Sequence, residues 1–98
     1  MEFDFKTSQQ MQLNLRNNSG SRVTGFSPSY SNNYRHWKWI YSASAHTCDV
    51  YEENANGIMT KKGTIDLSSQ NMTTMGFQIT DWQTDMDCWI KDFKVYYA

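Results

Sequence analysis

The sequence is short of proline, cysteine and net charge. Of its 98 residues, one is proline and two are cysteines, and the formal net charge is -1. Two cysteines are too few for a disulfide framework, and their spacing is not that of a zinc site. The near-zero charge gives no electrostatic reason to expect nucleic acid or an anionic membrane as a partner. No apolar run approaches the ~20 residues that a membrane-spanning helix needs.

Uncharged polar and aromatic residues are what the sequence holds in abundance. Ser, Thr, Asn and Gln make up about a third of the chain, and Trp, Tyr and Phe add 15%. Because Leu and Ala are scarce, this composition disfavours helices and favours strands joined by polar loops. It is also typical of surfaces that bind uncharged polar ligands through stacked rings and hydrogen-bonded amides, although Asn and Ser fill turns as well.

Alternation of apolar and polar residues predicts strands along the first half of the chain. In residues 2–7 and 10–16 every second side chain is apolar, and a turn-forming Asn-Asn-Ser-Gly sequence follows. We expect these two strands to be antiparallel neighbours. Residues 36–43 form the strongest strand, with Trp37 and Trp39 on one face. We expect both rings in the interior of a sandwich, and an aromatic ladder on an open sheet face is the alternative.

The second half of the chain continues the same pattern. Residues 47–52 and 75–80 alternate, and Lys61-Lys62-Gly63 predicts a turn between two short strands. Together the segments give about eight short strands, with no convincing helix and no internal repeat. The sequence therefore predicts one all-β domain spanning residues 1–98, an antiparallel two-sheet β-sandwich of the jelly-roll type.

The last strand changes parity part-way along. Its apolar residues are Cys88 and Ile90, then Phe93, Val95 and Tyr97. A β-bulge near Lys91-Asp92 would keep both sets facing the core. Trp89 then faces out, as a ligand platform or as an oligomer contact. Cys48 and Cys88 both have inward parity, and they are either buried thiols, which we favour, or one bridge between strands.

The order of features from Tyr34 onward resembles the C-terminal half of concanavalin A-like and laminin-G-like jelly-roll lectin domains. The matching segments are His36-Trp37, Val50-Tyr51 to Asn56-Gly57, Gly76-Phe77 and Ile90 to Tyr96. Carbohydrate-binding modules with jelly-roll folds end in similar strands. The resemblance implies binding of a glycan or of a protein surface, with a bound calcium ion in some members, and it carries over no catalytic residue.

Residues 81–87, which carry three carboxylates and a tryptophan, are the most unusual segment. One interpretation is a sugar site in which Trp82 stacks on a pyranose ring while Asp81, Gln83 and Asp85 hydrogen-bond to its hydroxyls. Tyr30, in the polar loop before the strongest strand, is a further candidate contact.

Two alternatives remain for the same acidic segment. Alternate aspartates together with backbone carbonyls supply oxygen ligands of the kind that calcium binds, which would make Asp81, Asp85 and Asp87 a metal site. The spacing is not that of an EF-hand, and no cofactor is required for the sugar site. The other alternative is a plain acidic surface loop.

The sequence holds no recognisable catalytic motif, so we expect a binding protein rather than an enzyme. The predicted function is that of a non-catalytic carbohydrate-binding, lectin-like module that recognises a glycan or polysaccharide. The alternative is a structural domain that docks protein through an exposed sheet face or edge, as a homo-oligomer or against other domains of a parent protein. Either role suits an extracellular, cell-surface or virion protein, with neither nucleic acid nor membrane as partner.

Overall fold

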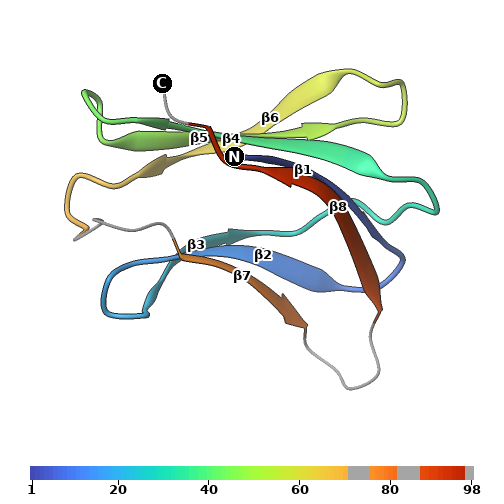
Figure 1. The fold of residues 1–98 in the computed structure, drawn as a ribbon, viewed down its shortest axis with the longest axis horizontal. Coiled ribbons are helices and arrows are strands. Elements are labelled where there is room, and N and C mark those ends of the chain that lie inside the picture. The colour runs from blue at the N-terminus through green and yellow to red at the C-terminus, as the bar shows by residue number, and fades with distance from the viewer. Residues whose placement is uncertain (71–75, 82–86, 97–98) are drawn as a thin grey trace.

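The computed structural model describes residues 1–70, 76–81 and 87–96, which form two antiparallel β-sheets packed face to face (Figure 1). The strands of these residues are β1 (Glu2–Thr7), β2 (Met11–Arg16), β3 (Arg22–Phe26), β4 (Arg35–Ser42), β5 (Thr47–Glu53), β6 (Met59–Asp66), β7 (Gly76–Asp81) and β8 (Cys88–Lys94). One sheet has the order β6-β5-β4-β1-β8 and the other has the order β3-β2-β7. The all-β, two-sheet architecture is confirmed. None of the described residues belongs to a helix that could cross a membrane.

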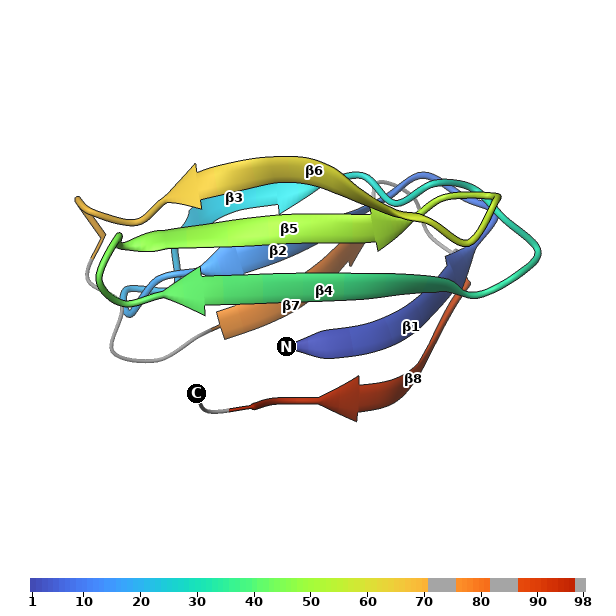
Figure 2. The ribbon, with the colours of Figure 1, turned by 90° about the horizontal axis from the view of Figure 1, so that it is seen from above.

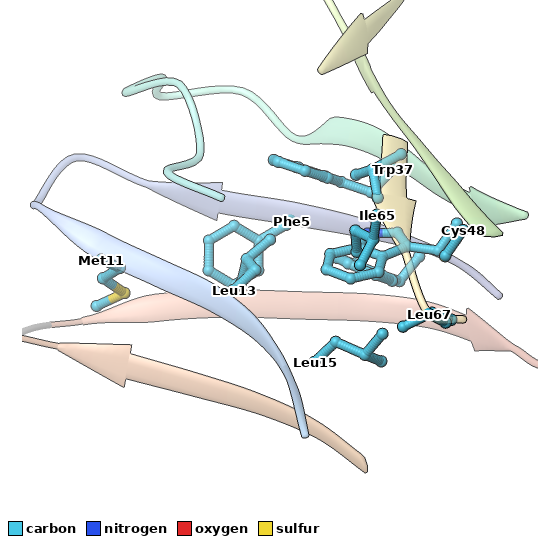
Figure 3. Close-up of a cluster of buried hydrophobic side chains, with 11 residues drawn as sticks. Phe5, Met11, Leu13, Leu15, Trp37, Cys48, Ile65 and Leu67 are labelled. Carbon is cyan, nitrogen blue, oxygen red and sulfur yellow. The ribbon is translucent and has the colours of Figure 1, made fainter. Parts of the chain in front are cut away.

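The core lies between the sheets and takes alternate side chains from each strand. β2 contributes its apolar face from one side, while β1, β4, β5 and β6 contribute theirs from the other (Figure 3). The fully buried large side chains include Trp37, Trp39, Phe3, Phe5, Met11, Leu13 and Leu15. The prediction that Trp37 and Trp39 lie in the interior is confirmed, and the aromatic-ladder alternative is wrong.

The prediction that the first two strands are neighbours was wrong. β1 pairs with β4 and β8, whereas β2 pairs with β3 and β7 in the other sheet. Both strands carry an apolar face, and these faces meet across the core, so residues 8–10 carry the chain from one layer to the other. The Asn-Asn-Ser-Gly turn of residues 17–20 instead closes a hairpin of β2 and β3, in which Gly20 has a φ of 77°.

The predicted turn at Lys61-Lys62-Gly63 was also wrong, because β6 runs through it as one strand. The pairing of β5 with β6 shifts by one residue, so that Val50 faces Gly63 and Tyr51 faces Lys61. This bulge accommodates Lys62 as the extra residue, and its ammonium lies 3.6 Å from a carboxylate oxygen of Glu52. The turn-like sequence is therefore part of a continuous strand that contains a bulge.

The C-terminal strand contains the predicted bulge but lies at an edge. Glu2 pairs with Lys94 and Asp4 with Lys91, so two residues of β8 oppose one of β1, and Asp92 has a φ of 54°. In Figure 2, β8 lies beyond the border of the three-stranded sheet. Inward parity therefore buries this strand only in part. Cys88 packs against the core and the Phe93 ring contacts Phe3, but Ile90 is 40% exposed and Phe93 is 49% exposed, which corrects the expected core role of these two residues. Tyr97 lies outside the described residues.

The two cysteines are thiols and form no bridge. Cys48 lies on β5 and Cys88 on β8, with β4 and β1 between them in the sheet. Three strand spacings amount to about 14 Å, which is about twice the largest Cα separation that a disulfide spans. Burial raises the pKa of Cys48 to about 11, so this thiol stays protonated.

On the outer face of the five-stranded sheet, His36 lies between two carboxylates of β1. Its Nε2 is 2.7 Å from Glu2 and its Nδ1 is 2.7 Å from Asp4. Partial burial alone would lower the pKa of His36. The hydrogen bonds to Glu2 and Asp4 and the charges of these residues outweigh burial, so the pKa of His36 is raised overall. The hydrogen bond from His36 lowers the pKa of Glu2.

These opposite shifts predict how stability depends on pH. The contribution of His36 is fully present below its unfolded pKa of about 6.5 and is lost as pH rises through its raised folded pKa. That of Glu2 is present above about 4.5 and is lost as pH falls through its lowered pKa. In urea unfolding from pH 4 to pH 9, the free energy of unfolding of the wild type should therefore decline above neutral pH. His36→Gln should lack this decline. An unchanged decline in His36→Gln would assign it to another group.

Candidate functional site

Several connections meet at one end of the sandwich, where β1 and β5 end and β4, β6 and β8 begin (Figure 1). The loops 8–10, 27–34 and 54–58 lie here. The end of β7 also reaches this end, because Asp81 pairs with Met11 at the start of β2. The start of β8 does so too, since Cys88 pairs with Thr7. Segments distant in sequence therefore converge, which is how sandwiches commonly build binding surfaces.

The loop of residues 27–34 is held down by a buried carboxylate. Glu52 occupies an inward position on β5 and is 4% exposed. Ser29 donates to it twice, from its backbone N–H at 2.9 Å and from its hydroxyl at 2.7 Å. The N–H of Ser31 then donates to the carbonyl of Thr7 at 2.9 Å. With Lys62 also close, the buried charge is satisfied and fixes the loop over the strand ends.

Between this loop and the β5–β6 hairpin lies a hollow of about 240 Å³, which we call the Tyr34 hollow. Most of its lining residues have polar side chains. The lining residues are Ser31, Asn33, Tyr34, Arg35, Glu53, Asn54, Ala55 and Gly57. Arg35 and Glu53 bring one charge of each sign, so the hollow is close to neutral.

The hairpin wall of the Tyr34 hollow is shaped by Asn54. Its side-chain carbonyl accepts hydrogen bonds from the backbone N–H groups of Asn56 at 2.9 Å and Ile58 at 3.0 Å. Gly57 has a φ of 78°, which a residue with a side chain rarely adopts. The opposite wall is joined to this one because the Arg35 guanidinium donates to the carbonyl of Glu53 at 3.2 Å. The hollow is therefore pre-formed by local hydrogen bonds.

A row of alternating cations and rings runs from Tyr34 across the outer face of the sheet. The ammonium of Lys6 lies 4.9 Å from the centroid of Tyr34 and 4.8 Å from that of Trp89. The ammonium of Lys91 lies 4.2 Å from the Tyr34 centroid. Such cation–π contacts hold exposed rings in place. We call these four residues the aromatic row, and Tyr34 belongs to both the row and the hollow.

The predicted ligand contacts fall in different places. Trp89 faces outward as predicted and is 46% exposed in the aromatic row. Tyr30 is 59% exposed in the loop above the strand ends, but it does not line the Tyr34 hollow. Asp81 closes β7, and only its backbone is described. Trp82, Gln83 and Asp85 lie outside the described residues.

The predicted metal ligands can be followed only in part. The backbone of Asp87 is fixed, since its carbonyl accepts from the Thr7 hydroxyl at 3.1 Å and its N–H donates to the side chain of Gln9. Asp85 and the side chain of Asp81 are not described. Across residues 1–70, 76–80 and 87–96, no group of His, Cys, Asp or Glu side chains is placed to hold a metal ion.

Two residues of the site were missed in the sequence, although each carried a signal. Glu52 continues the inward parity of Cys48 and Val50, and a carboxylate at a core position calls for partners. Tyr34 follows Asn33 in a polar stretch and lies two residues before the predicted strongest strand. Neither signal reveals that the β5–β6 hairpin lies opposite Tyr34, because that depends on the sheet order.

Comparison with protein-family models, with curated proteins and with solved structures gave no match.

Proposed function

We propose that the chain is a non-catalytic carbohydrate-binding module whose site is the Tyr34 hollow with the aromatic row beside it. The observation that carries the proposal is a polar hollow lined by Tyr34, whose ring belongs to the aromatic row. A sugar offers hydroxyls that both donate and accept. The carboxamide of Asn33 can do the same, and that of Asn54 can donate from its NH2 group, since its oxygen is bonded to the hairpin N–H groups. Its apolar ring face suits stacking on Tyr34 or Trp89.

The size and charge of the Tyr34 hollow support a small, neutral ligand. Its volume of about 240 Å³ lies below the range of about 300–1,000 Å³ typical of drug-sized sites, which favours one sugar ring or a chain end. Arg35 and Glu53 offset each other in charge. Glu53 is the one carboxylate among the described lining residues, whereas glycoside hydrolysis ordinarily uses a pair. Binding without catalysis is the role that fits.

The acidic segment extends this proposal. We infer that Trp82, together with Asp81, Gln83 and Asp85, adds ligand contacts, because the end of β7 and the start of β8 lie at the same end as the Tyr34 hollow. Tyr30 would serve the same ligand from the neighbouring loop. Calcium bound by Asp81, Asp85 and Asp87 is the alternative for this segment, and loss of glycan binding in chelator would favour it.

We further infer that the sandwich is a compact jelly-roll variant. In support, β1 pairs with β8 in one sheet and β2 pairs with β7 in the other, a nested pairing that follows jelly-roll wrapping. The variant departs from that wrapping at β3 and β6, which lie in different sheets. The proposal of an extracellular, cell-surface or virion location goes with this binding role.

A glycan array tests the proposal when it is probed with the wild type, Tyr34→Ala and Tyr41→Ala. Tyr41 is a matched control, because it is 44% exposed near the far end of β4, the strand that Tyr34 precedes. We expect wild-type binding that falls about tenfold in Tyr34→Ala, since a stacked ring contributes about 1 kcal/mol or slightly more. Tyr41→Ala should bind like the wild type. A blank array, or equal losses in both variants, would overturn the proposal.

A second candidate function is protein assembly through the β8 edge, and one observation favours it. β8 lies at the border of the five-stranded sheet and, with the two residues after it, exposes large apolar side chains (Figure 2). These are Trp89, Ile90, Phe93, Val95 and Tyr96, which are 40–59% exposed. Apolar edge strands recruit further strands, although Lys91, Lys94 and the bulge at Asp92 oppose indiscriminate pairing.

Light scattering after gel filtration tests this second candidate. If the edge recruits another copy, the wild type should elute as a dimer at micromolar concentration, and Ile90→Lys should be monomeric. Ile40→Lys is the control, because Ile40 is 46% exposed on the central strand β4. A monomeric wild type would rule out self-association through this edge.

A further inference from the structure

The outer face of the three-stranded sheet has an unusual composition. Since Met11, Leu13 and Leu15 point into the core, the alternate residues of β2 and their paired neighbours face outward. These are Gln12, Asn14 and Arg16 on β2, Arg22 and Gly25 on β3, and Gly76, Gln78 and Thr80 on β7. Among these described residues the only charges are two arginines, and none is aromatic. We call this surface the arginine face.

A β-bulge places the two arginines side by side. Leu15 pairs with Thr24, but Arg16 then pairs with Arg22, so Val23 is the extra residue. Val23 packs against the core, and this leaves Arg22 on the outside. Like charges directly opposite each other in a sheet are destabilising. Bulges often re-aim side chains at functional sites, so the arrangement favours a role in binding.

Each guanidinium is held by a glutamine and has no carboxylate partner among the described residues. Arg22 donates from Nη1 to Gln12 Oε1 at 2.8 Å. Arg16 donates from Nε to Gln78 Oε1 at 2.7 Å and from Nη1 to the carbonyl of Gly20 at 3.3 Å. A guanidinium has five N–H donors, so each arginine retains donors for a ligand.

Gly25 lies opposite Asn14, beside the arginine pair, and leaves room for the side chains of Asn14 and Gln12. A Cβ atom at Gly25 would lie 2.2 Å from the Oδ1 of Asn14 and 2.6 Å from the Cδ of Gln12. Asn14 is 1% exposed and donates to the hydroxyl of Thr80 at 2.7 Å, while its Oδ1 has no partner. The side chains of Gln12 and Asn14 therefore pack over Gly25, next to the two arginines.

We propose that the arginine face binds an acidic polysaccharide. The guanidiniums of Arg16 and Arg22 donate to carboxylate or sulfate oxygens, while the carboxamides of Gln12 and Gln78 bond to neighbouring hydroxyls. A nucleic acid is disfavoured because this face offers no ring on which bases stack, and the net charge of the chain is -1. The proposal shares only its ligand class with the proposed function, since the β2–β3 turn and the Tyr34 hollow lie at opposite ends of the sandwich.

Affinity electrophoresis at low salt tests the arginine face with four probes. They are polygalacturonate, dextran sulfate, neutral dextran and oligo-dT. We expect retardation by at least one of the two acidic polysaccharides and none by neutral dextran. Arg16→Gln and Arg22→Gln should each weaken binding about fivefold, and the double variant should weaken it more than either single change. Lys38→Gln, an equal charge change on the other sheet, should change binding less than twofold.

The outcomes separate this proposal from its competitors. Retardation lost equally in Lys38→Gln would indicate general charge attraction and overturn it, as would no retardation by either acidic polysaccharide. If oligo-dT binds as tightly as the acidic polysaccharides and also depends on the arginines, the face binds polyanions in general and the proposal of a polysaccharide ligand is overturned. Tyr34→Ala should bind the acidic polysaccharides like the wild type, so failure of the Tyr34 hollow leaves this result intact. Circular dichroism of each variant excludes misfolding as the cause of a loss.

Discussion

Trp39→Ala is expected to lower the free energy of unfolding by about 4 kcal/mol. Trp39 is 1% exposed and lies at the centre of an aromatic cluster. Phe26 and Phe77 meet it edge-on, each with a centroid distance of 5.8 Å, and Trp37 lies at 6.4 Å. Truncation therefore removes contacts from both sheets at once. Urea unfolding followed by far-ultraviolet circular dichroism measures the loss.

The next residue along the chain is the control for this prediction. Ile40 points to the opposite face of the same strand and is 46% exposed. Ile40→Ala should cost less than about 1 kcal/mol, because little of its side chain is removed from a packed environment. Equal losses in the two variants would mean that β4 does not have one buried and one exposed face.

Glu52→Ala is the second change with a large expected effect, about 3 kcal/mol of unfolding free energy. It removes both hydrogen bonds to Ser29 and leaves Lys62 without its nearby carboxylate. The consequence should be local as well as global, since Ser29 holds the loop that forms one wall of the Tyr34 hollow. We expect faster hydrogen exchange at the amide of Ser29 and weaker glycan binding.

Glu53→Ala is the matched control for Glu52→Ala, because the two residues are adjacent on β5 and point to opposite faces. It should cost less than about 1 kcal/mol and leave exchange at Ser29 unchanged, although it alters the hollow that it lines. Slow exchange at Ser29 in Glu52→Ala would contradict the role assigned to this buried carboxylate.

Alternation along the chain predicted the layers of this fold but not their order. The faces of β2 and β4 were readable because a side chain's parity in a strand does not depend on the neighbouring strand. The pairing of β1 with β8 was not readable, since it joins opposite ends of the chain. The bulge at Asp92 was predictable because a parity switch inside an apolar run has few other solutions.

The candidate site was less predictable than the fold, because its residues come from separate loops. Trp89 could be placed outward from its own strand, and the structure bears this out. Tyr34 can be recognised as a site residue only from the hairpin opposite it and from Lys6 and Lys91 beside it. Arg22 faces Arg16 only because Val23 is bulged. Val23 is bulged because it packs against the core, which the local sequence does not reveal.

The most direct test of the central claim is an amide-resonance titration with the tightest-binding neutral glycan from the array. If the Tyr34 hollow is the site, the largest chemical-shift changes should lie in residues 31–35 and 53–57, with smaller changes at Lys6 and Trp89. Changes confined to β8 beyond Trp89, with the hollow unaffected, would contradict the account and make the β8 edge the functional surface.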